Sequence, residues 1–121
     1  MAELIAKATR IPVPGGKTID EYVGRVTTGE SRLSIAHMVA PAGWTEPPQT
    51  PDFDEYTVVL RGTVLVDTPS GQLTVHAGQG VLTRAGERVR YATPPGEGAE
   101  YVAVCLPAFA PELARREEVA G

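Results

Sequence analysis

The 121-residue sequence contains a single cysteine, Cys105, and no apolar stretch long enough to cross a bilayer. One cysteine cannot form an internal disulfide, which excludes the small secreted scaffolds that depend on such bonds. A membrane-spanning helix needs about 20 apolar residues, and the N-terminus lacks the apolar core of a signal peptide. We therefore expect a reduced, cytoplasmic protein. Because Cys105 lies within the apolar run 101–106, we expect a buried thiol rather than a nucleophile.

Basic residues are scarce as well. The chain has 11 Lys and Arg against 15 Asp and Glu, a formal net charge of −4. The longest basic run is the pair 115–116. A nucleic-acid-binding protein needs a basic surface that displaces counterions from phosphates. We therefore expect neither nucleic acid nor a membrane to be a partner of this chain.

Short strands joined by turns account for most of the sequence. The 13 glycines and 11 prolines are spread along the chain, which disfavours a helical bundle. Between them, apolar and polar residues alternate with a period of two, as in half-buried strands. The expected strands are residues 4–8, 18–23, 33–39, 55–60, 63–66, 72–75, 81–83, 89–92 and 100–106. Eight or nine such strands predict an all-β sandwich or barrel. Only 112–119, after Pro111, has helical spacing, and we expect its charged residues, 115–118, to face solvent.

Two glycine-framed stretches carry more specific information. In residues 41–62, Gly43 is followed by Glu55 and, seven residues later, by Gly62; residues 78–89 have the form Gly-x7-Gly-x2-Val. Both stretches resemble the conserved motifs of the cupin superfamily. The resemblance spans residues 33–107 and implies the cupin double-stranded β-helix, a jelly-roll barrel, with a short C-terminal helix. We expect one domain, 1–121, with an N-terminal arm (1–30), a barrel core (about 31–107) and a C-terminal tail (108–121).

The metal ligands of that family are largely replaced. Cupins typically hold a metal with two His and a Glu from the first motif and a His from the second. The two His positions of the first motif fall on Gln49 and Pro51, or one residue earlier in the other common spacing, and that of the second falls on Val89. Only Glu55 remains, so we expect no cofactor. The alternative is a divalent metal held by Glu46, Gln49 and Glu55, since hard cations accept carboxylate and amide oxygens.

A closer resemblance is to the ethanolamine-utilisation branch of the cupins. It is carried by residues 53–62, by residues 86–94 and by Leu106-Pro107-Ala108. In that branch the His ligands are replaced too. Other metal-free cupins, such as sugar-nucleotide epimerases, perform acid–base chemistry inside the same barrel. The resemblance therefore implies a barrel that works on, or binds, a small molecule without metal.

Strand parity selects the candidate catalytic pair, Glu55 and Tyr91. If Glu55 points into the barrel, Thr57 does too, and Tyr56 points away. If Val89 occupies the former His position, Tyr91 also points inward. Glu55 and Tyr91 can then meet across the cavity and move a proton on a substrate. The alternative is a core tyrosine whose hydroxyl is simply satisfied by the glutamate.

Further ligand-binding candidates lie at the expected mouth of the barrel. Glu46 and Gln49 belong to a loop stiffened by prolines, which can hold polar groups over a pocket. Trp44 can wall that pocket or stack on a ring, or it can simply pack. Lys17 follows a Gly-Gly pair, and an arm that carries it can close the mouth and neutralise an anionic ligand; the alternative is a lysine that is simply solvated.

Two more positions remain open. Thr57 shares its expected orientation with Glu55. His37 lies in the middle of an expected strand, where a structural role competes with a position in the cavity, whereas we expect His76 to be exposed.

Three functions stay open from the sequence. The first is a metal-independent isomerase, epimerase, dehydratase or lyase that uses Glu55 and Tyr91. The second is a non-catalytic small-molecule-binding protein, and the third is a metal-dependent cupin with the atypical ligands Glu46, Gln49 and Glu55. In each case the partner is a small-molecule ligand, and the family resemblance implies a homodimer.

Overall fold

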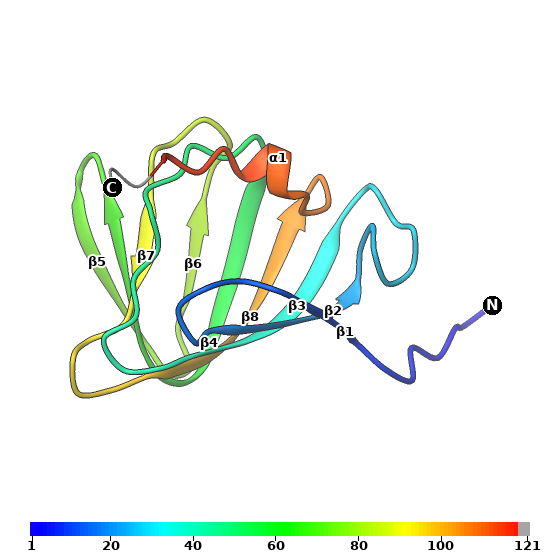
Figure 1. Ribbon diagram of the computed structural model, residues 1–121, viewed down its shortest axis with the longest axis horizontal. Coiled ribbons are helices and arrows are strands. Elements are labelled where there is room, and N and C mark those ends of the chain that lie inside the picture. The colour runs from blue at the N-terminus through cyan, green and yellow to red at the C-terminus, as the bar shows by residue number, and fades with distance from the viewer. Residues whose placement is uncertain (119–121) are drawn as a thin grey trace.

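The protein is a barrel of antiparallel strands. The computed structural model describes residues 1–118. Its elements are β1 (Thr9–Ile11), β2 (Thr18–Val23), β3 (Ser34–Ala40), β4 (Asp54–Thr68), β5 (Gly71–His76), β6 (Gly80–Thr83), β7 (Arg90–Ala92), β8 (Ala99–Leu106) and α1 (Pro111–Ala114). The strand order is β1-β2-β3-β8-β4-β5, and β6 and β7 also pair with β4 (Figure 1). This arrangement confirms the all-β fold class expected from the sequence.

Strand β4 connects the two sides of the barrel. Its first half pairs with β8 and β6, and its second half pairs with β5 and β7. The sequence predicted two strands here, 55–60 and 63–66, whereas the structure has a single bent strand. The bend follows a register shift between Val59 and Arg61. It includes Gly62, which has a φ of 79° and lies against the carbonyl oxygen of Gly98.

The interior is formed by every second side chain of these strands. The largest cluster of buried residues contains Val59, Val64, Val66, Val75, Val89, Tyr91 and Tyr101, together with Trp44 and smaller side chains. A second, smaller cluster joins Phe53 and Cys105 to Ala114 of α1. The Cys105 thiol is buried, as its apolar neighbours predicted. These packed residues leave a cavity beside Glu55, near the start of β4.

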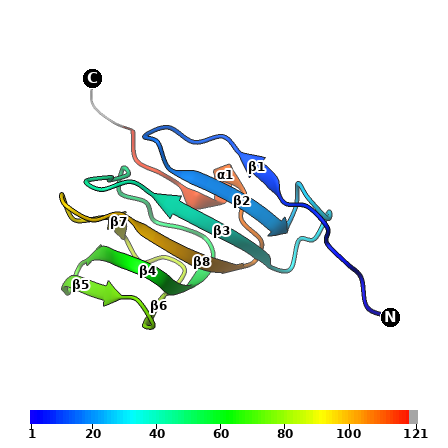
Figure 2. The same ribbon diagram turned by 90° about the horizontal axis from the view of Figure 1, so that it is seen from below.

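The N-terminal segment belongs to the sheet more than the sequence suggested. The expected strand 4–8 is absent, and the pairing begins instead with β1, which continues the sheet through β2 and β3. Figure 2 shows β1 and β2 lying alongside β3. The loop between β1 and β2 reaches the loop that follows β3, where Gly15 lies against the Trp44 ring. This loop positions Lys17, the first candidate residue of the chain.

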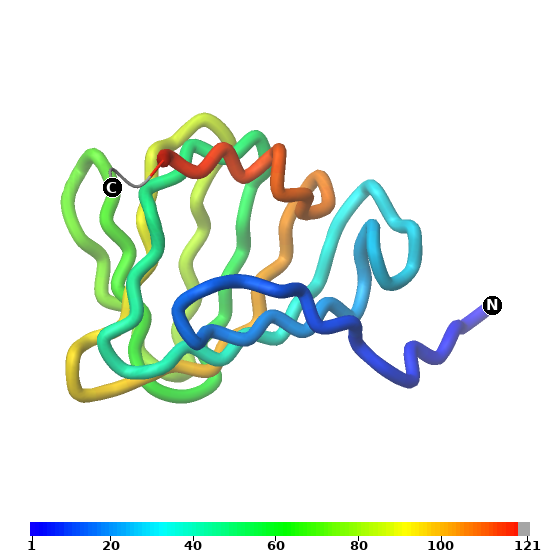
Figure 3. Tube along the Cα trace, in the orientation of Figure 1, coloured from blue at the N-terminus to red at the C-terminus, as the bar shows by residue number. Residues whose placement is uncertain are grey.

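The C-terminal helix is shorter than the spacing predicted. It ends at Ala114 because Arg115 adopts a left-handed conformation, with a φ of 51°. The chain then runs along the loop after β3, where the Glu117 amide donates to the Pro48 carbonyl over 2.8 Å (Figure 3). The last residue of the expected helix, Val119, lies outside the described residues. Within residues 1–118, no helix has the length and apolar character that a membrane crossing requires.

Candidate functional site

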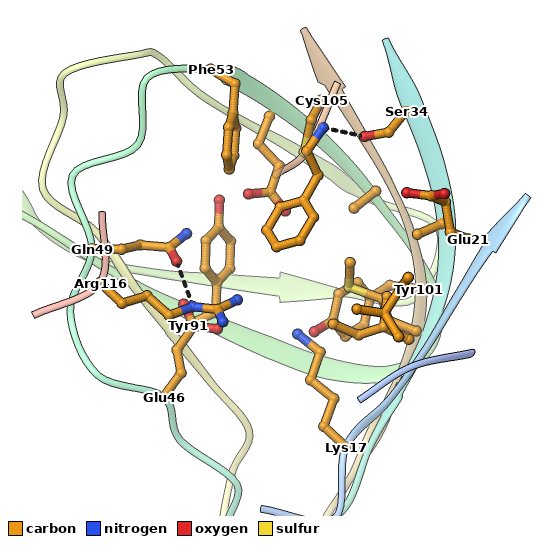
Figure 4. A pocket seen from close by; sticks show the side chains of 17 residues that line it. Lys17, Glu21, Ser34, Glu46, Gln49, Phe53, Tyr91, Tyr101, Cys105 and Arg116 are labelled. Atoms are coloured by element: carbon orange, nitrogen blue, oxygen red, sulfur yellow. Dashed lines mark hydrogen bonds between the residues drawn. The ribbon is translucent and has the colours of Figure 1, made fainter. Parts of the chain in front are cut away.

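A cavity lies inside the barrel (Figure 4). Strands line one side of it, and the segments that precede β2 and follow β8 contribute to the other side. The volume of this cavity, measured as the space open to the centre of a water molecule, is about 40 Å³. One water needs about 10–15 Å³ on this measure, so the cavity holds a few waters or a small chemical group. Its polar wall is formed mainly by Lys17, Glu46, Gln49, Glu55, Tyr91 and Arg116.

A second cavity adjoins the first at the outside of the barrel. Its volume on the same measure is about 280 Å³, and it is lined by the β1–β2 loop and by residues 44–47. Lys17, Ile19, Glu46 and Arg116 line both cavities. These four residues therefore separate the inner cavity from the outer one, and a ligand that enters the barrel by this route passes between them.

Glu55 is the enclosed acid of the inner cavity. It is the second residue of β4, and strand parity turns it inward, where its side chain is buried. Burial and, to a smaller extent, the neighbouring Glu46 raise the pKa of its carboxyl to about 7. The cations Lys17 and Arg116 and the Tyr91 hydroxyl oppose this rise. Near neutral pH the Glu55 carboxyl can therefore both accept and release a proton.

Tyr91 points into the same cavity from β7. Its hydroxyl lies 2.8 Å from the Thr83 hydroxyl of β6, which fixes the position of the ring. Burial and the nearby Glu55 carboxyl raise the pKa of the Tyr91 phenol. The phenol therefore stays protonated at neutral pH and can donate a hydrogen bond.

The loop after β3 supplies Glu46 and Gln49. Burial raises the pKa of the Glu46 carboxyl, and its Oε2 atom has no hydrogen-bond partner among the described residues. Gln49 is buried, and its backbone exchanges two hydrogen bonds with Val89. Its side-chain oxygen accepts a hydrogen bond from Nε of Arg116 over 3.3 Å.

Lys17 is held by aromatic rings rather than by an acid. Its Nζ atom lies 4.3 Å from the ring centroid of Trp44 and 5.3 Å from that of Tyr101. Within residues 1–118 no hydrogen bond or ion pair is formed by this ammonium group. Burial lowers the pKa of Lys17, whereas Glu46 and Glu55 act in the opposite direction. The hydroxyl of Tyr101 is likewise buried without a partner in the described chain.

Arg116 is the residue that sequence reasoning missed. The helical spacing of 112–119 predicted a solvated charge, and Arg116 is indeed exposed; after the early end of α1, however, it also lines both cavities. Its guanidinium carbon lies 5.9 Å from the ring centroid of Phe109. Nothing in the local sequence marks this position, because it depends on where the helix ends.

Three other candidates lie elsewhere. His37 faces the outer side of the sheet, where its Nε2 atom lies 2.6 Å from Oε2 of Glu100; of the two roles left open by the sequence, its parity on β3 therefore favours the structural one, and the ligand-binding position is corrected. Thr57 is buried with an unpartnered hydroxyl, but it does not line the inner cavity. Trp44 walls the outer cavity and packs in the core. His76 is exposed, as predicted.

Metal-binding clusters are absent from the described part of the chain. Among residues 1–118, no three His, Cys, Asp or Glu side chains come together in a way that could hold an ion. The oxygens of Glu46, Gln49 and Glu55 share their cavity with the side chains of Lys17 and Arg116.

Solved structures define the class of this fold. No family model matches the sequence. The polyketide cyclase RemF from Streptomyces resistomycificus is 16% identical, with a TM-score of 0.75 over 99% of this chain and 87% of that chain. The nucleoside dehydratase Pac13 is 15% identical, with a TM-score of 0.74 over 100% and 93%. A putative ethanolamine utilisation protein Q from Salmonella typhimurium is 20% identical, with a TM-score of 0.65 over 77% and 71%. The chain therefore has a cupin-type barrel fold, as its glycine-framed motifs predicted.

One curated protein is similar in sequence. It is called endoribonuclease YbeY, from Myxococcus xanthus, and is 43% identical over 114 residues. The match includes 93% of this chain but only 38% of that protein. The chain thus spans well under half the length of this relative.

Proposed function

We propose that this cupin-type barrel binds a small polar metabolite and moves a proton on it without a metal, in an isomerase, epimerase, dehydratase or lyase reaction. One observation carries the proposal: an enclosed carboxyl, Glu55, faces the Tyr91 hydroxyl inside a cavity that adjoins an outer one. A general base works best when its pKa is close to the working pH. The value of about 7 for Glu55 suits that task, with Tyr91 as the hydrogen-bond donor to the charge that develops.

The composition of the cavity supports metal-free chemistry. Two cationic side chains, Lys17 and Arg116, line the same cavity as Glu46, Gln49 and Glu55, and they would repel a divalent ion bound there. The amide oxygen of Gln49 already accepts a hydrogen bond from Arg116. The donor set therefore fits a metal poorly, and no step of the proposed reaction uses one.

Binding without chemistry is the second candidate. The observation in its favour is that Tyr91 is held by Thr83, so its hydroxyl can serve as a fixed recognition group.

We propose no endoribonuclease activity for this chain. Its net charge of −4 disfavours the binding of RNA. In addition, the match to the named relative covers only 38% of that protein. A cytoplasmic location remains a prediction.

The first experiment separates catalysis from binding. A library of small metabolites is incubated in deuterated water with the wild-type protein and with Glu55→Gln, and proton NMR records both ligand binding and the loss of C–H signals. We expect a bound metabolite to exchange a C–H proton with the wild type. The variant should bind it but exchange it about 10²- to 10⁴-fold more slowly, the usual contribution of a general base.

Two controls make the outcome decisive. Glu112→Gln changes an exposed carboxyl on α1 and should exchange like the wild type. Prior treatment with a chelator should leave the rate of C–H proton exchange unchanged. A metal-dependent cupin would instead lose its exchange activity after this treatment. Binding without exchange by the wild-type protein would instead leave only the binding function.

We also propose that two copies pair through the outer face of the sheet. That face exposes a group of large apolar side chains: Tyr22, Tyr56, Val58, Leu60, Leu82 and Leu106. Val58 lies opposite Val102 in the β4–β8 register, near the middle of this face. We expect light scattering to give about twice the chain mass of 12.8 kDa and Val58→Lys to give the single-chain mass. A monomeric wild type would contradict the pairing.

A further inference from the structure

Two cations in the cavity lack an acidic partner. Within residues 1–118, neither Lys17 nor Arg116 has a carboxylate within ion-pairing distance, although eight such pairs occur elsewhere in the described chain. Lys17 is supported by aromatic rings, and Arg116 by the neutral amide of Gln49 and the Phe109 ring. Lys17 is half-buried, and a buried cation normally pairs with an anion, whereas Arg116 is exposed on its outer side. Here that anion is not supplied by the described side chains.

The acids of the cavity do not balance these charges. Burial favours the neutral form of both Glu46 and Glu55, and the Glu46 carboxylate further disfavours the ionisation of Glu55. Lys17 and Arg116 therefore line the place where the two cavities meet without forming an ion pair with either acid. The buried Tyr101 hydroxyl, which has no partner, adds a hydrogen-bond donor beside Lys17.

We infer that the ligand carries a carboxylate, which Lys17 and Arg116 hold where the two cavities meet. The inference rests on the proposed function, because it names the class of metabolite that the same site takes. A guanidinium group is a planar fork that matches a carboxylate, and the ammonium group supplies a second charge. The carboxylate lies between the cavities, so the adjoining carbon enters the small inner cavity toward Glu55 and Tyr91.

This placement also fits the chemistry. Cations on a carboxylate withdraw electron density from the neighbouring carbon and stabilise the negative charge that develops when a proton leaves it. Glu55 takes that proton as its carboxylate and becomes a carboxylic acid, and the electron pair of the C–H bond remains on the substrate. The ligand class is therefore a small 2-hydroxy acid, in which the carbon next to the carboxylate carries a hydrogen, with room for a short substituent in the outer cavity.

Matched probes test the assignment. Lactate and pyruvate are titrated into the wild-type protein by calorimetry and NMR, beside lactamide, which has the shape of lactate without its charge, and inorganic phosphate. We expect lactate or pyruvate to bind at least tenfold more tightly than lactamide or phosphate, and to bind more weakly as salt concentration rises. Lys17→Met and Arg116→Met should each weaken binding of the acid about tenfold to a hundredfold, as the loss of a charge-assisted hydrogen bond does.

The chain offers a control for each variant. Lys7 is the other lysine and is exposed, and Arg115 is the exposed neighbour that pairs with Asp52. Lys7→Met and Arg115→Met should bind the acid like the wild type. The inference is overturned if lactamide or phosphate binds as well as the acids, if neither acid binds, or if the Lys17 and Arg116 variants bind normally. Failure of the proposed function looks different: the acids bind normally, but Glu55→Gln leaves proton exchange unchanged.

Discussion

Between about pH 4.5 and pH 7, the wild-type chain is expected to lose about 3 kcal/mol of folding free energy through Glu55 alone. In the unfolded chain this carboxyl ionises near its ordinary value of 4.5, whereas in the folded chain it ionises at about 7. In that interval the folded state holds the proton and the unfolded state does not. The stability that Glu55 contributes is therefore greatest below pH 4.5 and falls as pH rises to about 7, at about 1.4 kcal/mol per unit.

Urea unfolding at several pH values measures this effect. Glu55→Gln cannot ionise, so the variant should lose about 3 kcal/mol less than the wild type across the interval and should be the more stable protein at pH 8. Part of the slope remains, because the pKa of Glu46 is also raised. The other groups that face Glu55, namely Lys17, Arg116, Tyr91 and Cys105, are present in both proteins. Identical slopes in the two proteins would show that Glu55 is not enclosed.

Gly62→Ala is expected to be the most destabilising small substitution in the barrel. A Cβ atom built at this position would lie 2.0 Å from the carbonyl oxygen of Gly98, and the backbone φ of 79° is itself unfavourable for alanine. The obstacle is backbone, so the strands β4 and β8 would have to separate. Overpacking and left-handed strain each cost about 1–3 kcal/mol, and together they predict a loss of about 3–5 kcal/mol.

Gly78→Ala separates the two contributions. Gly78 has a φ of 85° but no atom within 4 Å of its Cβ position. This variant carries the conformational strain without the clash and should lose only about 1–2 kcal/mol. The denaturation midpoints of the two variants measure the difference. Equal losses would mean that the approach of Gly62 to Gly98 is not close, and the bend of β4 would need another cause.

The sequence predicted the barrel and its enclosed acid because both depend on local patterns. Alternation along β4 placed Glu55 inside, and the same parity placed Tyr91 inside on β7. The prediction failed where position depends on distant contacts. Arg116 enters the cavity because α1 ends early and the tail pairs with the loop after β3. The orientation of His37 could not be predicted from alternation, because a polar residue in the middle of a strand can face either side of the sheet.

The meeting of Lys17 and Arg116 at one site has a consequence for how the protein is made. One cation precedes β2 and the other follows α1, so almost the whole described chain separates them. A ribosome adds the strands of the barrel before it adds Arg116. A nascent barrel thus contains Glu55 and Lys17 while Arg116, the second cation of the proposed ligand site, is still missing.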